Sequence, residues 1–279
     1  GSGAQQLNYP YGVALAPDGD IFVADVVNNR VQRCPASGSG DCTTVAGTAG
    51  SGDCTTVAGG QGQGSGAQQL HTPTGVALAP GGDIIVADLR NHRVQRCPAS
   101  GSGDCTTVAG GQGAGSGAQQ LNQPTRVALA PDGDIIVADW GYPYGVALAP
   151  DGGIIVVDGH NHRVQRCPAA GSGDCTTVAG GQGAGSGAKQ LYGPAGVALS
   201  PDGYIIVADH HNSRIQRCPA TGSGDCTTAA GGQGRGSGAQ QLESPHDIAF
   251  ATDGDMIVAD WGNHRIQRCP VTGSGDCTT

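Results

Sequence analysis

The stretch PAGVALSPDGYIIVADHHNSRIQRCPATGSGDC, residues 194–226, decides the fold because the rest of the chain repeats it. Successive copies start 63, 51, 19, 51 and 51 residues apart, so the underlying period is 51. Repeats of this length are typical of proteins in which each unit packs against its neighbours. The other copies begin at Pro10, Pro73, Pro124, Pro143 and Pro245.

Two of these intervals depart from the period. The first is longer because GSGDCTTVAG occurs twice, at residues 38–47 and again at 50–59. The third is shorter because Trp140-Gly141 runs straight into Tyr142-Pro143. The copy that begins at Pro124 therefore keeps only the segments of its first two expected strands.

Each full repeat predicts four short strands. GVALA alternates, with Val13 and Leu15 on one face, and a PDGD tight turn follows it. DIIVAD is apolar without alternation, as expected for a strand that is covered on both faces. RVQRC and DCTTVAG supply the third and fourth strands, and a glycine-rich linker leads to the next repeat.

Four-stranded units repeated in this way predict an all-β protein, a β-propeller with one sheet per blade. Six copies of the first two strands favour six blades, five of them full and one truncated. We expect one propeller domain over residues 1–279. Its repeats are expected at approximately 8–59, 71–110, 122–141 (truncated), 142–180, 192–231 and 243–279.

The pattern PxGVALAPDGDIIVADxxNHRVQ resembles the NHL repeat, and the resemblance covers nearly the whole chain. Members of that family form β-propellers, commonly with six blades, and the resemblance implies an interaction module that binds proteins or, in some members, RNA. The long period, the cysteine pair in each repeat and the truncated copy depart from the family pattern. They leave open whether five or six blades are present.

Related propellers include lyases that hold zinc with histidines near the central channel. By that resemblance His71 and His246 are candidate ligands, with Arg126 and Tyr144 at comparable positions. Only two of the six positions carry histidine, whereas a catalytic zinc site uses three protein ligands. We therefore predict no metal, no cofactor and no catalytic residue, and keep a zinc-dependent lyase or hydrolase as an alternative.

Ten of the 11 cysteines form five pairs with one spacing, each bracketing a PxxGSGD loop. The loop joins the third and fourth strands, and opposed hairpin positions approach closely enough for a disulfide. Five disulfides indicate an extracellular or secretory-lumen protein. Free buried thiols and zinc ligation are alternatives, and Cys54 competes with Cys42 for Cys34. The pairs are Cys34/Cys42, Cys97/Cys105, Cys167/Cys175, Cys218/Cys226 and Cys269/Cys277.

The repeats differ from one another on one side of the predicted propeller, where the second-to-third loop and the inter-repeat linker emerge. Aromatic, histidine and arginine residues concentrate there, and binding residues commonly lie on loops carried by a rigid scaffold. Unconstrained drift of loop sequence is the alternative. The predicted binding residues are Tyr11, His71, Thr74, Arg126, Trp140, Tyr144, His160, His210, His211, His246, Asp247 and Trp261.

Other recurring residues fit a scaffold. In each full repeat an Asp ends the second strand and an Asn and an Arg follow, as Asp25 and Arg30 do, which predicts a local ion pair. The histidine of NHR, as at His92, is expected to pack in its loop. The PDGD turns lack a calcium-loop pattern, and GGQGxGSG lacks the lysine and helix of a phosphate-binding loop.

The composition narrows the classes of function. The chain carries 14 Lys and Arg against 23 Asp and Glu, a net charge of −9, and Lys189 is its single lysine. This argues against nucleic-acid binding, which needs a concentrated basic surface, and no apolar run is long enough to span a membrane. We predict a non-catalytic module that binds a protein or glycan. The alternative is an assembly element completed by strand addition from a neighbouring propeller, that is, self-assembly.

Overall fold

The computed structural model describes residues 6–35, 55–98, 100, 103–115, 119–130, 133–139, 143–167, 175–222, 224–271 and 277–278. The chain forms two compact units. Unit 1 holds Gly1–Gly141 with His264–Ile266, and unit 2 holds Tyr142–Asn263 with Gln267–Thr278. No helix in the described ranges is long and apolar enough to cross a membrane.

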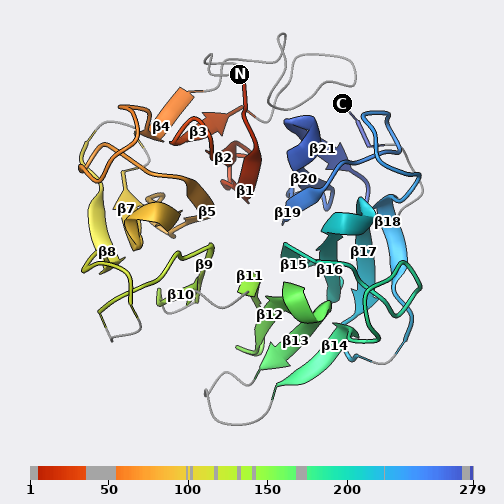
Figure 1. Cartoon of the computed structure of the whole chain (residues 1–279). Coiled ribbons are helices and arrows are strands. Elements are labelled where there is room, and N and C mark those ends of the chain that lie inside the picture. The colour runs from red at the N-terminus through yellow and green to blue at the C-terminus, as the bar shows by residue number, and fades with distance from the viewer. Residues whose placement is uncertain are drawn as a thin grey trace. The chain divides into compact units, whose positions relative to one another are not determined.

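Unit 1 contains two four-stranded sheets, in the orders β1-β2-β3-β4 and β5-β6-β7-β8, and the two-stranded sheet β9-β10 (Figure 1). Its strands are β1 (Pro10–Leu15), β2 (Ile21–Asp25), β3 (Arg30–Cys34), β4 (Thr55–Gly59), β5 (Pro73–Leu78), β6 (Ile84–Asp88), β7 (Arg93–Cys97), β8 (Thr106–Gly110), β9 (Arg126–Leu129) and β10 (Ile135–Ala138).

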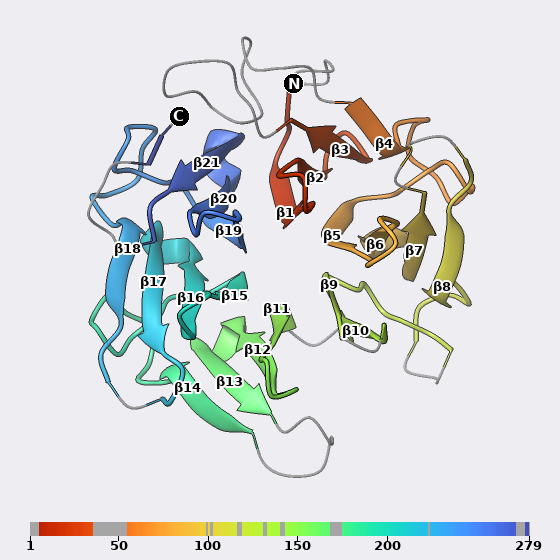
Figure 2. The same cartoon turned by 180° about the vertical axis from the view of Figure 1, so that it is seen from behind.

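Unit 2 contains the four-stranded sheets β11-β12-β13-β14 and β15-β16-β17-β18, and most of the three-stranded sheet β19-β20-β21, seen from behind in Figure 2. Its strands are β11 (Pro143–Leu148), β12 (Ile154–Asp158), β13 (Arg163–Cys167), β14 (Thr176–Gly180), β15 (Val197–Leu199), β16 (Tyr204–Asp209), β17 (Arg214–Pro219), β18 (Thr227–Gly231), β19 (Pro245–Phe250), β20 (Met256–Asp260) and β21 (Arg265–Cys269).

The strand order confirms the four-stranded repeat in four of the five full copies, and in the fifth an isolated bridge between Arg268 and Thr278 lies beside β21. Burial explains the pattern of the strands. Every residue of β2, β6 and β20 is buried, because both faces of the second strand are covered. The fourth strand is half-exposed, as in β4, where the two threonines point to solvent and Val57 and Ala58 are buried. The 3₁₀ turns after the second strands were not expected; they are η1 (Leu89–Asn91), η2 (Gly159–Asn161), η3 (His210–Asn212) and η4 (Trp261–Asn263).

The prediction of a sixth, incomplete blade is not supported. The copy at Pro124 gives only β9 and β10, paired from Ile135↔Leu129 to Ala138↔Arg126. Without a third and fourth strand, the outer edge of β10 has no neighbouring strand in its own repeat, and Ile135, Ile136 and Val137 are only partly buried. The propeller therefore has five blades, and β9-β10 is a remnant sheet.

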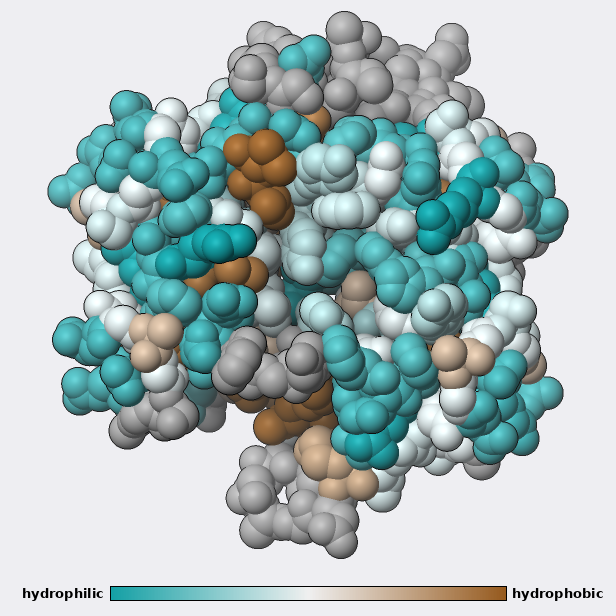
Figure 3. Space-filling model, viewed as in Figure 1, coloured by the Kyte–Doolittle hydropathy of each residue, from teal (hydrophilic) through white to brown (hydrophobic). Residues whose placement is uncertain are grey.

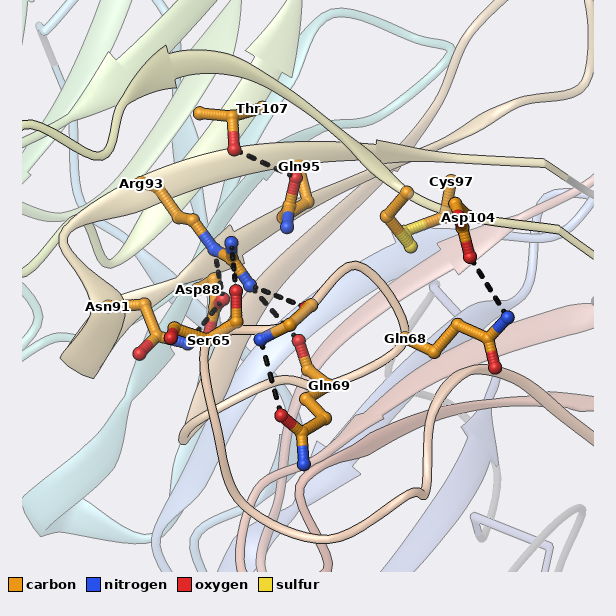
Figure 4. The surroundings of a disulfide bond; sticks show 12 residues. Ser65, Gln68, Gln69, Asp88, Asn91, Arg93, Gln95, Cys97, Asp104 and Thr107 are labelled. Carbon is orange, nitrogen blue, oxygen red and sulfur yellow. Dashed lines mark hydrogen bonds and ion pairs between the residues drawn. A yellow bond between two sulfur atoms is a disulfide. The ribbon is translucent and has the colours of Figure 1, made fainter.

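A buried ion pair closes the turn between the second and third strands, as the sequence predicts. Asp88 accepts hydrogen bonds from Nε of Arg93 at 2.7 Å and from Nδ2 of Asn91 at 2.8 Å. Arg93 in turn donates to the carbonyls of Ser65 and Gln69, so the preceding linker is held against the blade (Figure 4). The same Asp–Arg pair recurs in unit 1 at Asp25–Arg30 and in unit 2 at Asp158–Arg163 and Asp209–Arg214.

The NHR histidines link consecutive repeats. Nδ1 of His92 accepts a hydrogen bond from the backbone N–H of Gln123, and Nδ1 of His162 accepts one from Gly193, both at 3.1 Å. Asn29 serves the same purpose through its side-chain oxygen, which accepts from the N–H of Thr72 at 2.9 Å. The residues that carry these side chains adopt left-handed backbone conformations, with φ of 52° at both Asn29 and His92. The histidine is therefore a connector between repeats, as well as a loop residue.

Four of the five predicted disulfides are present among the described residues: Cys97–Cys105, Cys167–Cys175, Cys218–Cys226 and Cys269–Cys277. Cys34 is disulfide-bonded as well, but Cys42 and Cys54 lie outside the described residues. Figure 4 shows Cys97 near Gln68 and Asp104, whose side chains are joined by a hydrogen bond of 2.9 Å. Each cystine thus anchors the outer hairpin of a blade.

Candidate functional site

A cavity of about 370 Å³ lies in unit 2, where the turn after one second strand meets the start of the next blade. Five histidines and two tyrosines supply most of its walls. Its volume falls within the range of small-molecule sites. We call it the junction cavity; it is lined by Tyr144, Gly159, His160, His162, Tyr192, Gly193, Pro194, Ala195, His210, His211 and His246.

The local sequence provides both the space and the rings. Gly159 opens the η2 turn, and a Cβ atom there would collide with Cδ2 of Tyr144 and lie 2.8 Å from the Pro194 carbonyl oxygen. Gly193 has φ of +54°, and a Cβ atom there would collide with the ring of His211. Ala195 is the smallest residue found at its position in any repeat. Two glycines and an alanine therefore leave room for the aromatic walls.

The rings form a chain of edge-to-face contacts. The ring centroids of His162 and Tyr192 lie 5.6 Å apart, those of Tyr192 and His211 lie 4.8 Å apart, and those of His211 and His210 lie 4.8 Å apart. His210 continues the chain edge-to-face to His246 at 5.3 Å, and it also lies 5.9 Å from Trp261 in a tilted arrangement. Edge-to-face packing is a favoured arrangement of aromatic rings, so the walls hold one another in place.

Burial keeps the central histidine neutral. It lowers the pKa of His210 from the ordinary 6.5 to about 4, with a smaller contribution from the neighbouring His211, and a hydrogen bond to the Pro245 carbonyl offsets part of the effect. The pKa of His211 is also lowered, by burial and then by the charge of Arg235. Among the described residues, Nδ1 of His210 is buried and has no hydrogen-bond partner. The centre of the cavity wall is therefore uncharged at neutral pH.

This lowered pKa predicts acid sensitivity. Between pH 6.5 and 4 the unfolded chain binds a proton at His210 that the folded chain does not, so stability falls as the pH falls. The loss amounts to about 3 kcal/mol in the free energy of unfolding, and His210 adds no further loss below its folded-state pKa of about 4. Urea unfolding at several pH values measures it.

The control for this measurement is His210→Leu, because Leu89 occupies the same position in another repeat. Its acid loss should be smaller than that of the parent chain by about the same 3 kcal/mol. Parallel pH profiles for the two proteins would contradict the assigned pKa.

The structure places the predicted binding residues in different surroundings. Tyr144, His160, His210, His211 and His246 line the junction cavity, and Trp261 contacts it through His210. Asp247 is buried beside His246 on β19 and does not line the cavity. Trp140 lies outside the described residues.

In unit 1, Tyr11, Thr74 and Arg126 come together on the first strands of three repeats. Arg126 is only 4% exposed. Its guanidinium group donates to the Thr74 carbonyl at 2.8 Å and to the Tyr11 carbonyl at 3.3 Å, and lies 5.2 Å from the centroid of the Tyr11 ring. This cluster joins neighbouring strands. His71 begins the same blade as Thr74 and donates its N–H to Asp88.

Sequence reasoning missed several residues of the cavity. Tyr192 is not among the predicted binding residues, and the NHR motif predicts that His162 packs in its loop, although each lines the cavity. Gly159, Gly193 and Ala195 gave no positive signal because they contribute space. A comparison of side-chain size at equivalent repeat positions would have found them.

Within the described part of the chain, no group of three or more His, Cys, Asp or Glu side chains is placed to hold a metal ion. The histidines of the cavity instead face one another edge-on, and Nδ1 of His162 already accepts a backbone hydrogen bond.

Comparisons with known proteins agree with the repeat and the fold. The model of the NHL repeat matches five segments, one in each full repeat: residues 7–34, 70–97, 141–167, 191–218 and 242–269. No curated protein matches the chain.

Solved structures of similar fold have different activities. Virginiamycin B lyase from Staphylococcus aureus is 14% identical, with 94% of this chain and 80% of that chain covered and a TM-score of 0.55. A gluconolactonase from Xanthomonas campestris is 12% identical, with 96% and 88% covered and a TM-score of 0.68. An auxiliary nutrient binding protein from Bacteroides thetaiotaomicron is 13% identical, with 94% and 69% covered and a TM-score of 0.63. At these identities the likeness concerns the fold alone.

Proposed function

We propose that this chain, which belongs to the NHL-repeat family of β-propeller proteins, is a non-catalytic extracellular module that binds a protein or glycan partner through the junction cavity. The observation that carries the proposal is the concentration of rings there: five histidines and two tyrosines surround one space of about 370 Å³. Aromatic side chains on a rigid scaffold are effective binding anchors because they bring large contact area at low cost in conformational entropy.

The distribution of exposed apolar side chains supports this location. Figure 3 shows a face of mainly hydrophilic residues with small, separate hydrophobic patches. Among the described residues only three large hydrophobic side chains are exposed, Val27, Val108 and Tyr192, and Tyr192 lines the cavity. A partner that binds elsewhere would find few apolar anchors on the described surface.

The disulfides support an oxidising environment for the module. Four bridges are present among the described residues, and such bridges are rare in reducing compartments. Together with a net charge of −9, they favour an extracellular protein that binds other proteins or glycans over one that binds nucleic acid.

Alanine substitution tests the proposed site. A double variant, Tyr144→Ala with Tyr192→Ala, should bind at least tenfold more weakly to any partner found by screening the intact chain on glycan and peptide arrays, a loss of about 1.4 kcal/mol. The matched control is Tyr11→Ala, which removes the ring equivalent to Tyr144 in unit 1, and it should bind like the parent chain. Equal affinity of the double variant and the parent would overturn the proposal.

A lyase or hydrolase is the second candidate, because histidine side chains commonly act as general acids or bases in catalysis. The described lining contains no carboxylate to pair with them. The pKa of His210, about 4, leaves it a neutral imidazole at neutral pH, so it is no general acid and only a weak general base. Turnover of a lactone or cyclic ester that is abolished by His246→Ala and by chelation would favour this candidate over the binding module.

A further inference from the structure

The junction cavity lies where two consecutive repeats meet and where the residues at the contact have little or no side chain. The three positions that meet at a junction are the residue after the second strand and two residues at the start of the next blade. In unit 1 they are Val26, Thr72 and Thr74 at one junction and Leu89, Gln123 and Thr125 at the next; in unit 2 they are His210, Ser244 and His246 at one junction, and Gly159, Gly193 and Ala195 at the cavity.

Emptying a junction in this way removes packing and adds backbone freedom, both of which destabilise a fold. Gly159 is nevertheless fitted against the Tyr144 ring and Gly193 against the His211 ring. The rings of Tyr144 and His211 thus occupy the room beside the two glycines, and about 370 Å³ remains between the lining residues. Aromatic rings bound most of this space.

The walls combine flat apolar faces with polar ring edges. The tyrosines carry hydroxyl groups, and an imidazole can donate and accept hydrogen bonds. Nδ1 of His162 is already taken by the Gly193 N–H, whereas Nδ1 of His210 has no partner among the described residues. Neither Asp, Glu, Lys nor Arg occurs among the described lining residues. The matching ligand has apolar faces, hydroxyl groups around its edge and no charge.

We infer that the junction cavity binds a neutral sugar ring of a glycan. The C–H bonds on the face of a pyranose pack against the faces of Tyr144 and Tyr192, while its hydroxyl groups hydrogen-bond to phenol and imidazole groups. This inference rests on the proposed function, because it names the ligand class of the same cavity. A peptide side chain such as proline would pack against the rings but make no hydrogen bond to Nδ1 of His210 or to the tyrosine hydroxyl groups. An anionic sugar would lack a cation in the described lining.

The test uses the full chain and four probes: methyl β-D-glucopyranoside, methyl α-D-mannopyranoside, N-acetylglucosamine and anionic glucuronic acid. Saturation-transfer NMR and titration calorimetry measure binding. At least one neutral sugar should bind saturably, and glucuronic acid should bind at least tenfold more weakly. Failure of all the neutral sugars, or equal binding of glucuronic acid, overturns the inference.

Two variants locate the binding. Ala195→Tyr introduces the side chain that Tyr11 and Tyr144 carry at the same repeat position, and Gly193→Ser introduces the residue of Ser244, whose φ of 53° is close to the 54° of Gly193. Each should weaken sugar binding at least tenfold while thermal melting shows a folded chain. The control is Thr74→Ala, which removes side-chain volume at the position in unit 1 that is equivalent to Ala195. This variant should bind the sugar as strongly as the parent chain does. Undiminished sugar binding by both filled variants overturns the inference.

The same variants separate this inference from the proposed function. If the sugars fail but a peptide from the array binds the parent and not Ala195→Tyr, the cavity is a binding site and only the sugar assignment is wrong. If every partner of the parent binds both filled variants equally well, the cavity is not the binding site, and the proposed function fails together with the sugar assignment.

Discussion

Replacement of Asp209 by alanine is expected to lower the free energy of unfolding by about 3–5 kcal/mol, as for other buried ion pairs that lose one partner. The Asp209 side chain is fully buried. Its Oδ1 atom accepts from the N–H of Tyr192 at 2.7 Å, and its Oδ2 atom accepts from Asn212 at 2.8 Å and from Nε of Arg214 at 2.7 Å. Without the carboxylate, the Arg214 side chain, which is 10% exposed, has no counter-charge.

Arg214 also explains why the effect should spread beyond one turn. It donates to the carbonyls of Ser186 at 2.8 Å and Gln190 at 3.1 Å, so it fixes the linker that precedes its blade. Asp209 and Arg214 together hydrogen-bond to the linker that precedes the blade, to Tyr192 just before its first strand, and to the η3 turn after its second strand. Loss of the carboxylate should therefore loosen Tyr192 in the junction cavity as well as destabilise the blade.

The chain contains a matched control for this prediction. Asp139 occupies the same position in the truncated repeat and accepts the N–H of Asn122 at 2.7 Å, but no arginine follows it in that repeat. Asp139→Ala should therefore cost only about 1 kcal/mol, the value of an ordinary hydrogen bond. Urea unfolding of the two variants measures the difference. Equal losses would show that the buried charge of Arg214 is not what makes Asp209 important.

The regular features of the fold were predictable because each recurs in at least five repeats and has a local cause. The apolar second strand, the tight turn, the Asp–Arg pair and the cysteine spacing all depend on residues within one repeat. The loss of the outer strands of β9 and β10 was predictable from the truncation at Trp140-Gly141. The blade number was not: six copies of the inner strands suggested six blades, but a two-stranded remnant does not form one.

The candidate site was predictable only in part, for a physical reason. Tyr144, His210 and His246 could be selected because large polar and aromatic side chains are visible in a sequence. The space between them arises from Gly159, Gly193 and Ala195, which become meaningful only when the loop of one repeat is placed against the start of the next. Arg126 shows the reverse: a charged residue at a variable position lies buried among backbone carbonyls of neighbouring strands.

Complete reduction of the disulfides is expected to unfold the chain at 37 °C. Each bridge closes a loop of about nine residues, which corresponds to roughly 2–3 kcal/mol on the loop-entropy model. Four such bridges are described, so their combined contribution is comparable with the whole stability of a typical domain, about 5–15 kcal/mol. The expected result is a loss of the cooperative thermal transition after reduction and alkylation, with the unmodified protein as reference.

Burial predicts how the reduction should proceed. Cys97, Cys218 and Cys269 are fully buried, so a reductant reaches these bridges only when the outer hairpin opens. Mild reductant without denaturant should therefore leave them intact, and alkylation of the unreduced chain should modify at most one of its 11 cysteines. Intact mass spectrometry counts the modified thiols. Ready alkylation of several cysteines in protein from its natural source would contradict both the bridges and the extracellular assignment.

A single bridge can be separated from the rest by Cys218→Ala with Cys226→Ala. This variant should lose roughly 2–3 kcal/mol, the value for one loop, and remain folded, because the hydrogen bond from the Cys226 N–H to the Ala188 carbonyl at 3.0 Å still holds the hairpin to its linker. A stability equal to that of the parent would mean that other contacts already fix the hairpin and that the cystine adds no stability. A loss well above 3 kcal/mol would mean instead that the hairpin depends on the bridge for its packing, as expected if the outer strand β18 has no other strong attachment to the blade.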